Sequence, residues 1–346
     1  MKINGLATGI GSLPYKDSKE ALDFIFKYTP QVPFWPQLPR RNIREGMVAQ
    51  FSEGMPCIEV TDKGIFFNSE DKEKELEKFY ARLIVNDLDY FQISSGFALG
   101  LHTFYHYLKL NPSLLRNIEY IKGQVTGPFT FAASVNDSEG RAIMHNPVFL
   151  QAVSEGLAMK ALWQIGMLKK FGKPIIIFLD EPYLACFGSA FTPINRDDVI
   201  KALTEIAEKI NSPETLVGVH CCGNTDWSIF TEIKGIDIIS FDAFGFLERV
   251  LLYADELKSF FKRGGILAWG IVPTEAFSSE VNVSVLVKKI KSGIEVLVQK
   301  GIDEDLLKKR LIITPSCGLG ALISDKAKPI FKCLSELSSI LKTESI

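Results

Sequence analysis

Eight short apolar runs alternate with longer helical patterns along this 346-residue chain, and this alternation constrains the fold more than any other feature. Several runs are apolar at every position, which is typical of parallel strands that are covered on both faces. Strands and helices that alternate in this way form α/β folds. The expected strands cover residues 5–10, 32–35, 120–125, 174–179, 216–219, 236–241, 265–269 and 311–313.

We predict a single-domain (β/α)8 TIM barrel over residues 1–346, with a doubly wound open sheet as the alternative. Single barrels commonly reach this length, and no Pro/Gly/Ser-rich linker divides the chain. The covering helices are expected within residues 147–171, 196–210, 246–261 and 282–300. Residues 57–67 depart from the repeat, because two β-rich pieces flank an Asp-Lys-Gly turn, and they predict an inserted hairpin. The charged segment 69–87 is expected to form a solvated helix.

The composition excludes several classes of protein. Hydrophobic residues make up 47% and charged residues 23%, so the chain can bury a sizeable core. The net charge of −2 gives no reason to expect a nucleic acid or an anionic membrane as a partner. The sequence shows neither a membrane span nor a signal peptide, so we expect a cytoplasmic protein. Its six cysteines are then expected to be thiols, ligands or nucleophiles rather than disulfides.

A metal-binding pattern lies at the ends of two expected strands. His220 and Cys222 follow the apolar run 215–219, and Cys317 follows the run 311–316. One imidazole and two thiolates form a Cys2His set that leaves one or two zinc positions open, as catalytic zinc sites do. Each residue alone could be an ordinary core residue. Cys221 points to the opposite side of an extended strand, so we expect it to pack rather than to bind.

Other polar residues also follow expected strands, and in a barrel these strand ends converge on one mouth where active sites lie. Asp180 and Glu181 are adjacent carboxylates. We expect one of them to face the mouth and to pair with a cationic substrate group. The alternative is that they form a polar turn. Residues 34–41 could line a pocket, although the aromatic residues there are more typical of a core. The remaining strand-end residues of this kind are Ile10, Gly11, Ser12, Thr126, Asp242 and Glu275.

The order of these motifs resembles the C-terminal catalytic half of cobalamin-independent methionine synthase. The shared motifs are Ile-Gly-Ser at 10–12, Thr-Gly-Pro at 126–128, Asp-Glu-Pro at 180–182, His-x-Cys at 220–222 and Cys-Gly-Leu at 317–319. The run His-Cys-Cys-Gly-Asn at 220–224 is also similar to the His-x-Cys-Gly motif of corrinoid:thiol methyltransferases, relatives within the uroporphyrinogen decarboxylase superfamily. The likeness extends from about residue 5 to 320.

The resemblance implies roles for individual residues. His220, Cys222 and Cys317 would be ligands of Zn²⁺, and the family's fourth ligand, a glutamate, has its nearest match in Asp242. The backbone and hydroxyl groups of residues 10–12 would contact homocysteine, Asp180 would bind its ammonium group, and Thr126 and Glu181 are further candidates for substrate contact. The histidine acid of the synthase is replaced by Glu275, the candidate catalytic residue here.

The hypothesis that follows is a zinc-dependent methyltransferase that acts on a homocysteine-like thiol and makes methionine. The synthase also has an N-terminal barrel that helps to bind folate, and nothing in these 346 residues supplies it. The methyl donor is therefore left open between a folate and methylcobalamin or a corrinoid protein. Two alternatives remain: a corrinoid:thiol methyltransferase that acts on another thiol, and a non-catalytic thiol- or corrinoid-binding barrel with structural zinc.

Overall fold

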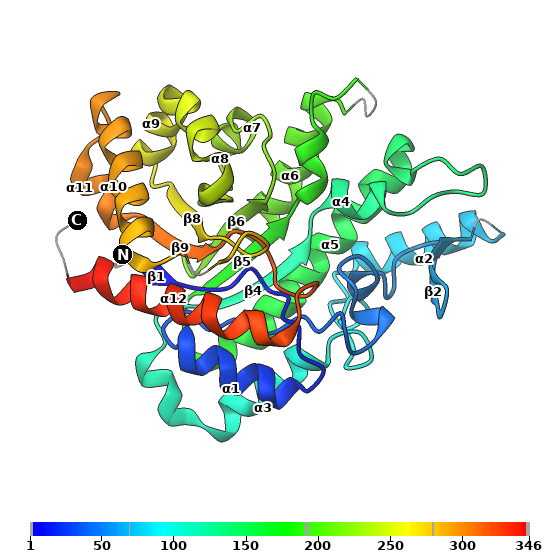
Figure 1. The fold of residues 1–346 in the computed structure, drawn as a ribbon. Helices are drawn as coiled ribbons and strands as arrows, with labels where there is room; N and C mark the ends of the chain where they lie inside the picture. Colours follow the sequence, from blue (N-terminus) through cyan, green and yellow to red (C-terminus); the bar gives the residue numbers. More distant parts are fainter. Residues whose placement is uncertain (1–2, 69, 191–193, 279, 344–346) are drawn as a thin grey trace.

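The computed structural model describes residues 3–68, 70–190, 194–278 and 280–343, and a curled parallel sheet lies at its centre (Figure 1). Neighbouring strands follow the order β1-β9-β8-β7-β6-β5-β4 and are all parallel. The strands are β1 (Leu6–Ala7), β4 (Ile121–Thr126), β5 (Ile175–Asp180), β6 (Thr215–Cys221), β7 (Ile238–Phe241), β8 (Ile266–Val272) and β9 (Leu311–Pro315). This half-barrel confirms the predicted α/β class.

The segment 32–35, which was expected to be a strand, does not join this sheet as a regular strand. Phe34 makes an isolated parallel bridge to Lys122 of β4, and Gln37 makes another to Ser12 beyond β1. Prolines occupy positions 30, 33 and 36, and a proline has no N–H group to donate to a ladder. In the described ranges the sheet therefore has seven strands where the sequence predicted eight.

Helices surround the outer face of the sheet (Figure 1). They are α1 (Ser18–Tyr28), α2 (Lys72–Ile84), α3 (Leu99–Leu110), α4 (Pro128–Ala133), α5 (Pro147–Leu168), α6 (Arg196–Ile210), α7 (Ser228–Glu232), α8 (Ala243–Val250), α9 (Ala254–Lys262), α10 (Val283–Gln299), α11 (Glu304–Lys309) and α12 (Ser324–Thr343). Within the described residues, no helix combines the length and the apolar character that a membrane span needs.

Local sequence signals explain where several helices begin. The side chain of Asn195 accepts a hydrogen bond from Asp197 N at the start of α6, and that of Asn282 accepts one from Val285 N at the start of α10. Such caps satisfy backbone N–H groups that the first turn leaves free. The inserted hairpin is confirmed as the antiparallel pair β2 (Ile58–Thr61) and β3 (Gly64–Phe67), and α2 follows it.

Alternate strand residues form two apolar layers, one inside the curled sheet and one under the helices. In β5, Ile176 and Phe178 belong to the inner layer, whereas the residues at 175, 177 and 179 belong to the outer one. Because side chains alternate along a strand, Asp180 shares the inner face with Phe178. The same alternation places His220 on the inner face of β6 and Cys221 in the outer layer. Inward-facing polar residues at the carboxyl ends of the strands thus point into one space.

Candidate metal centre

The imidazole of His220 is held at the end of β6 by a neighbouring strand. In the sheet register His220 lies opposite Ser240 of β7, and its Nδ1 is 3.0 Å from the Ser240 hydroxyl oxygen. Only 2% of His220 is exposed. Its Nε2 is buried without a hydrogen-bond partner among the described residues. Because buried polar atoms are almost always paired, this nitrogen is a candidate ligand for a group that the protein binds.

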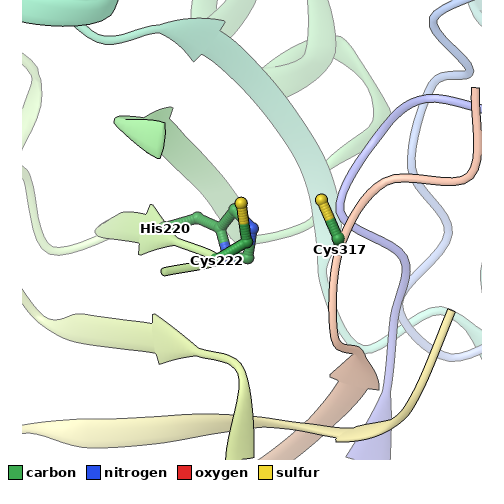
Figure 2. A group of neighbouring side chains, drawn as sticks. All are labelled: His220, Cys222 and Cys317. Carbon is green, nitrogen blue, oxygen red and sulfur yellow. The ribbon is translucent and has the colours of Figure 1, made fainter. Parts of the chain in front are cut away.

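Two half-buried thiols lie beside this ring. Cys222 continues the inner face of β6 two residues beyond His220, and Cys317 comes from the loop after β9 (Figure 2). One ligand atom from each of the three residues lies within 4.8 Å of the other two, so the cluster could hold a metal ion. The sheet itself separates β6 from β9 by two strands. Only its curvature brings these residues together.

The two thiols are electrostatically linked. A hydrogen bond from the Cys317 thiol lowers the pKa of Cys222, against the effect of burial. The same interaction and burial raise the pKa of Cys317. The pKa of Cys222 therefore lies below that of Cys317. A bound cation would change this, because thiol ligands lose their protons on coordination.

The three candidate ligands open into a cavity of about 520 Å³. This volume falls within the range of small-molecule sites, about 300–1,000 Å³. The cavity has both apolar and polar walls. Its lining consists of Ile10, Ser12, Gln37, Pro39, Arg40, Glu45, Met47, Asp180, Pro182, His220, Cys222, Cys317, Gly318, Gly320 and Ala321. The predicted substrate residues Ile10, Ser12 and Asp180 are thus brought together with the predicted metal ligands.

Asp180 offers a buried anionic acceptor to this cavity. Its Oδ1 is buried and has no hydrogen-bond partner in the described ranges. Burial raises the pKa of this carboxyl group, and the ammonium group of Lys122 partly offsets the rise. Burial also lowers the pKa of Lys122 itself. A cationic or hydrogen-bond-donating group in the cavity would supply the partner that Asp180 lacks.

Lys122 holds the cavity wall formed by residues 10–12 through a hydrogen bond to its backbone. This fully buried ammonium group donates hydrogen bonds to Ile10 O and Gln124 Oε1, and it lies 4.4 Å from the ring centroid of Phe178. At Gly11, a Cβ would lie 2.5 Å from Gln37 Oε1, so only glycine allows this close approach. A fully apolar strand would not need a lysine at an inward position, so Lys122 is a sequence signal for a polar site on the inner face of β4.

The structure places Glu181 outside the cavity lining. Glu181 Oε1 accepts a hydrogen bond from Phe129 N, and Oε2 accepts hydrogen bonds from the backbone and hydroxyl groups of Thr130. Both oxygens therefore hold the first turn of α4. Burial raises the pKa of Glu181 to about 7, although these hydrogen bonds oppose the rise. Glu181 has no atom in the cavity lining, so its contact with a substrate stays a prediction.

Thr126, Asp242 and Glu275 also lie apart from the cavity lining. The Thr126 hydroxyl donates to the carbonyl oxygen of Met47, so Thr126 supports a lining residue. Asp242 Oδ1 accepts from Gly245 N at 2.7 Å as the cap of α8, and Asp242 is not one of the three clustered ligands. Glu275 is exposed on the loop after β8. The roles of Thr126 as a substrate contact, of Asp242 as a fourth ligand and of Glu275 as an acid remain predictions.

One wall of the cavity comes from residues 37–47, most of which were not predicted as site residues. The stretch 34–41, a possible pocket wall in the sequence, supplies Gln37, Pro39 and Arg40. Trp35 from the same stretch is instead fully buried and donates a hydrogen bond to Gln164. Glu45 and Met47 had no recognisable signal, because they lie outside the expected strands.

Comparison of the chain with protein-family models finds no match, and comparison with curated proteins finds none either.

Proposed function

We propose that this protein is a zinc-dependent methyltransferase that activates a homocysteine-like thiol. The observation that carries the proposal is the cluster of His220, Cys222 and Cys317 on the wall of a cavity of about 520 Å³. Asp180, with an unpartnered buried oxygen, lines the same cavity. The metal-binding cluster and the acceptor Asp180 thus line one cavity. A thiol amino acid needs both, because its sulfur would bind the metal and its ammonium group would bind the carboxylate. The motif order shared with methionine synthase supports the same activity.

We also propose that the fold is a (β/α)8 barrel in which residues 31–37 occupy the eighth strand position. The isolated bridges of Phe34 to Lys122 of β4 and of Gln37 to Ser12 beyond β1 support this assignment. Lys122 N of β4 donates to Pro33 O, and Leu13 N beyond β1 donates to Gln37 O, so the segment accepts hydrogen bonds from both sides. The prolines account for the irregular ladder.

The donor set fits zinc. Thiolate and imidazole ligands favour Zn²⁺ over Mg²⁺ or Ca²⁺, which prefer oxygen. His220 would bind through Nε2 while Nδ1–H donates to Ser240, an outer hydrogen bond that metal-binding histidines usually make. Three protein ligands leave a coordination position for a substrate, as in catalytic zinc sites. Bound zinc would supply the positive charge that keeps a substrate thiol deprotonated near neutral pH.

The residues of the chain would position the two reactants. Asp180 would accept the substrate's ammonium group, and the wall formed by Ile10 and Ser12 would confine its carbon chain. The substrate sulfur would then attack the methyl carbon of the donor in line and take the methyl group, while the donor's leaving group departs on the opposite side. The protein contributes orientation and exclusion of water to this transfer.

The first experiment compares bound zinc in the wild type, Cys222→Ser and Cys317→Ser, with Cys186→Ser as a control at an exposed cysteine outside the cluster. We expect about one zinc per wild-type and Cys186→Ser chain, and weaker binding in the two cluster variants. A wild type that binds no zinc would reject the proposal.

The second experiment assays methionine formation from homocysteine in parallel with methylcobalamin and a methylfolate. Product formed with either donor supports the proposal and identifies the donor. If zinc binds but homocysteine does not change its X-ray absorption spectrum, the metal is structural and the activity is rejected.

A further inference from the structure

The loop that carries Cys317 is fixed at both of its ends, and neither anchor lies on β6. At its start, Ser316 N donates to Val272 O at 2.8 Å, and the Ser316 hydroxyl accepts from Thr274 N at 3.2 Å. At its end, Leu319 N donates to Ser12 O at 2.9 Å. The position of Cys317 relative to His220 therefore depends on contacts with other parts of the mouth.

A single arginine spans the far end of this loop. Arg40 Nε donates to Gly320 O at 3.2 Å, and Arg40 Nη2 donates to Ala321 O at 2.9 Å. A Cβ on Gly320 would lie 2.6 Å from Pro39 Cγ, so the loop packs tightly on the segment before Arg40. The planar guanidinium group matches two neighbouring acceptors at once, which a lysine ammonium cannot do with the same geometry. Hydrogen bonds from a charged donor are also stronger than neutral ones.

The two nearby arginines make different contacts. Arg41 forms an ion pair with the buried Glu45. Arg44 lies over the ring of Phe97, with its guanidinium carbon 5.5 Å from the ring centroid. Neither donates to residues 317–321 in any hydrogen bond of the described chain. Arg44 therefore provides a matched control for the loss of a surface guanidinium.

We propose that Arg40 is a positioning residue for Cys317, and that its contacts with Gly320 and Ala321 hold the thiol within reach of His220 and Cys222. The inference rests on the metal site of the proposed function, but it does not depend on methyl transfer. Without Arg40, the end of the loop would keep hydrogen bonds to Ser12 alone, and a metal ion would have to order the loop when it binds. That ordering costs conformational entropy and lowers affinity.

The test measures zinc affinity by competition with a chromophoric chelator for Arg40→Gln, Arg40→Lys and Arg44→Gln. We expect Arg40→Gln to bind zinc about 10–100-fold more weakly, which is the usual effect of losing a group that orients a ligand. Arg40→Lys should be intermediate, and Arg44→Gln should match the wild type. In the cobalt-substituted protein, Arg40→Gln should also weaken the thiolate-to-cobalt absorption band, which a merely structural role would leave intact.

A double-mutant cycle makes the test specific to Cys317. In a Cys317→Ser background, Arg40→Gln should change zinc affinity by less than about twofold, because coupled residues lose their effect together. Four outcomes would each overturn the inference. Arg40→Gln could bind zinc as tightly as the wild type, or Arg44→Gln could lose as much zinc affinity as Arg40→Gln. Arg40→Gln could also cause its full loss of zinc affinity in the Cys317→Ser background, or the wild type could bind no zinc. If the Arg40 effect is present but no methyl transfer is found with either donor, the proposed function fails and the inference stands.

Discussion

The ring of His220 and the hydroxyl of Ser240 form a hydrogen-bonded pair across β6 and β7, with 3.0 Å between Nδ1 and Oγ. Both residues are buried, and the sheet register places them opposite each other. In the described chain Nε2 has no hydrogen-bond partner, and the ring lies in the cluster with Cys222 and Cys317. The protein alone thus fixes the orientation of the ring.

Replacing Ser240 should therefore weaken metal binding. For Ser240→Ala we expect zinc affinity to fall about 10–100-fold, because the ring loses the hydrogen bond that fixes its orientation. Competition with a chelator measures the change. Thr314→Val is the control, because Thr314 has a buried hydroxyl on β9 with no hydrogen-bond partner among the described residues. Equal affinities for Ser240→Ala and the wild type would contradict the role of the pair.

Asp180→Asn should weaken the binding of an amino thiol without removing the metal. A charge-assisted hydrogen bond contributes about 1.5–3 kcal/mol, so homocysteine should bind roughly 10–100-fold more weakly. The affinity for 4-mercaptobutyrate, which lacks the amino group, should change little. Titration of the cobalt-substituted protein with each thiol measures both affinities. If both thiols lose affinity equally, Asp180 does not recognise the ammonium group.

Lys160 should make the free energy of unfolding rise with pH. Burial lowers the pKa of this α5 lysine to about 8, below the ordinary value of 10.5. Between these values the unfolded chain binds more protons than the folded one, so stability increases as pH rises. From pH 7.5 to 9.5 we expect the wild type to gain about 2 kcal/mol relative to Lys160→Met. Urea unfolding of both proteins at the two pH values measures this gain, and parallel pH profiles would refute it.

Glu181→Ala should lower the stability of the fold while leaving zinc affinity nearly unchanged. The substitution removes the acceptor for Phe129 N and for both donors of Thr130. Buried donors left without partners cost about 1–3 kcal/mol, so we expect a loss of about 2–3 kcal/mol in urea unfolding. Glu275→Gln, a change at an exposed carboxylate, should unfold like the wild type. Unchanged stability in Glu181→Ala, together with loss of thiol binding, would favour the predicted substrate contact instead.

Strand alternation accounts for much of what could be predicted about the site. Because successive side chains point to opposite faces, His220 and Cys222 share one side of the chain and Cys221 lies on the other. The structure confirms that Cys221 packs in the outer core layer. The same rule separates Asp180 from Glu181, but alternation did not indicate which of the two faces inward, and only the resemblance to methionine synthase favoured Asp180. The register with His220 and the start of α4 settle that choice.

The sequence by itself determined most of the secondary structure, apart from the strand expected at residues 32–35, and the kinds of donor atoms available, because helix caps, turn residues and strand alternation are local properties. The parallel strands, the hairpin at 57–67 and the polar residues at strand ends all follow from such patterns. The tertiary structure alone decided that Cys317 meets His220, that Ser240 orients the ring and that Arg40 holds the Cys317 loop. These contacts join residues that lie 20 to 281 positions apart. They depend on the curvature of the sheet and on loop packing, which no local pattern encodes.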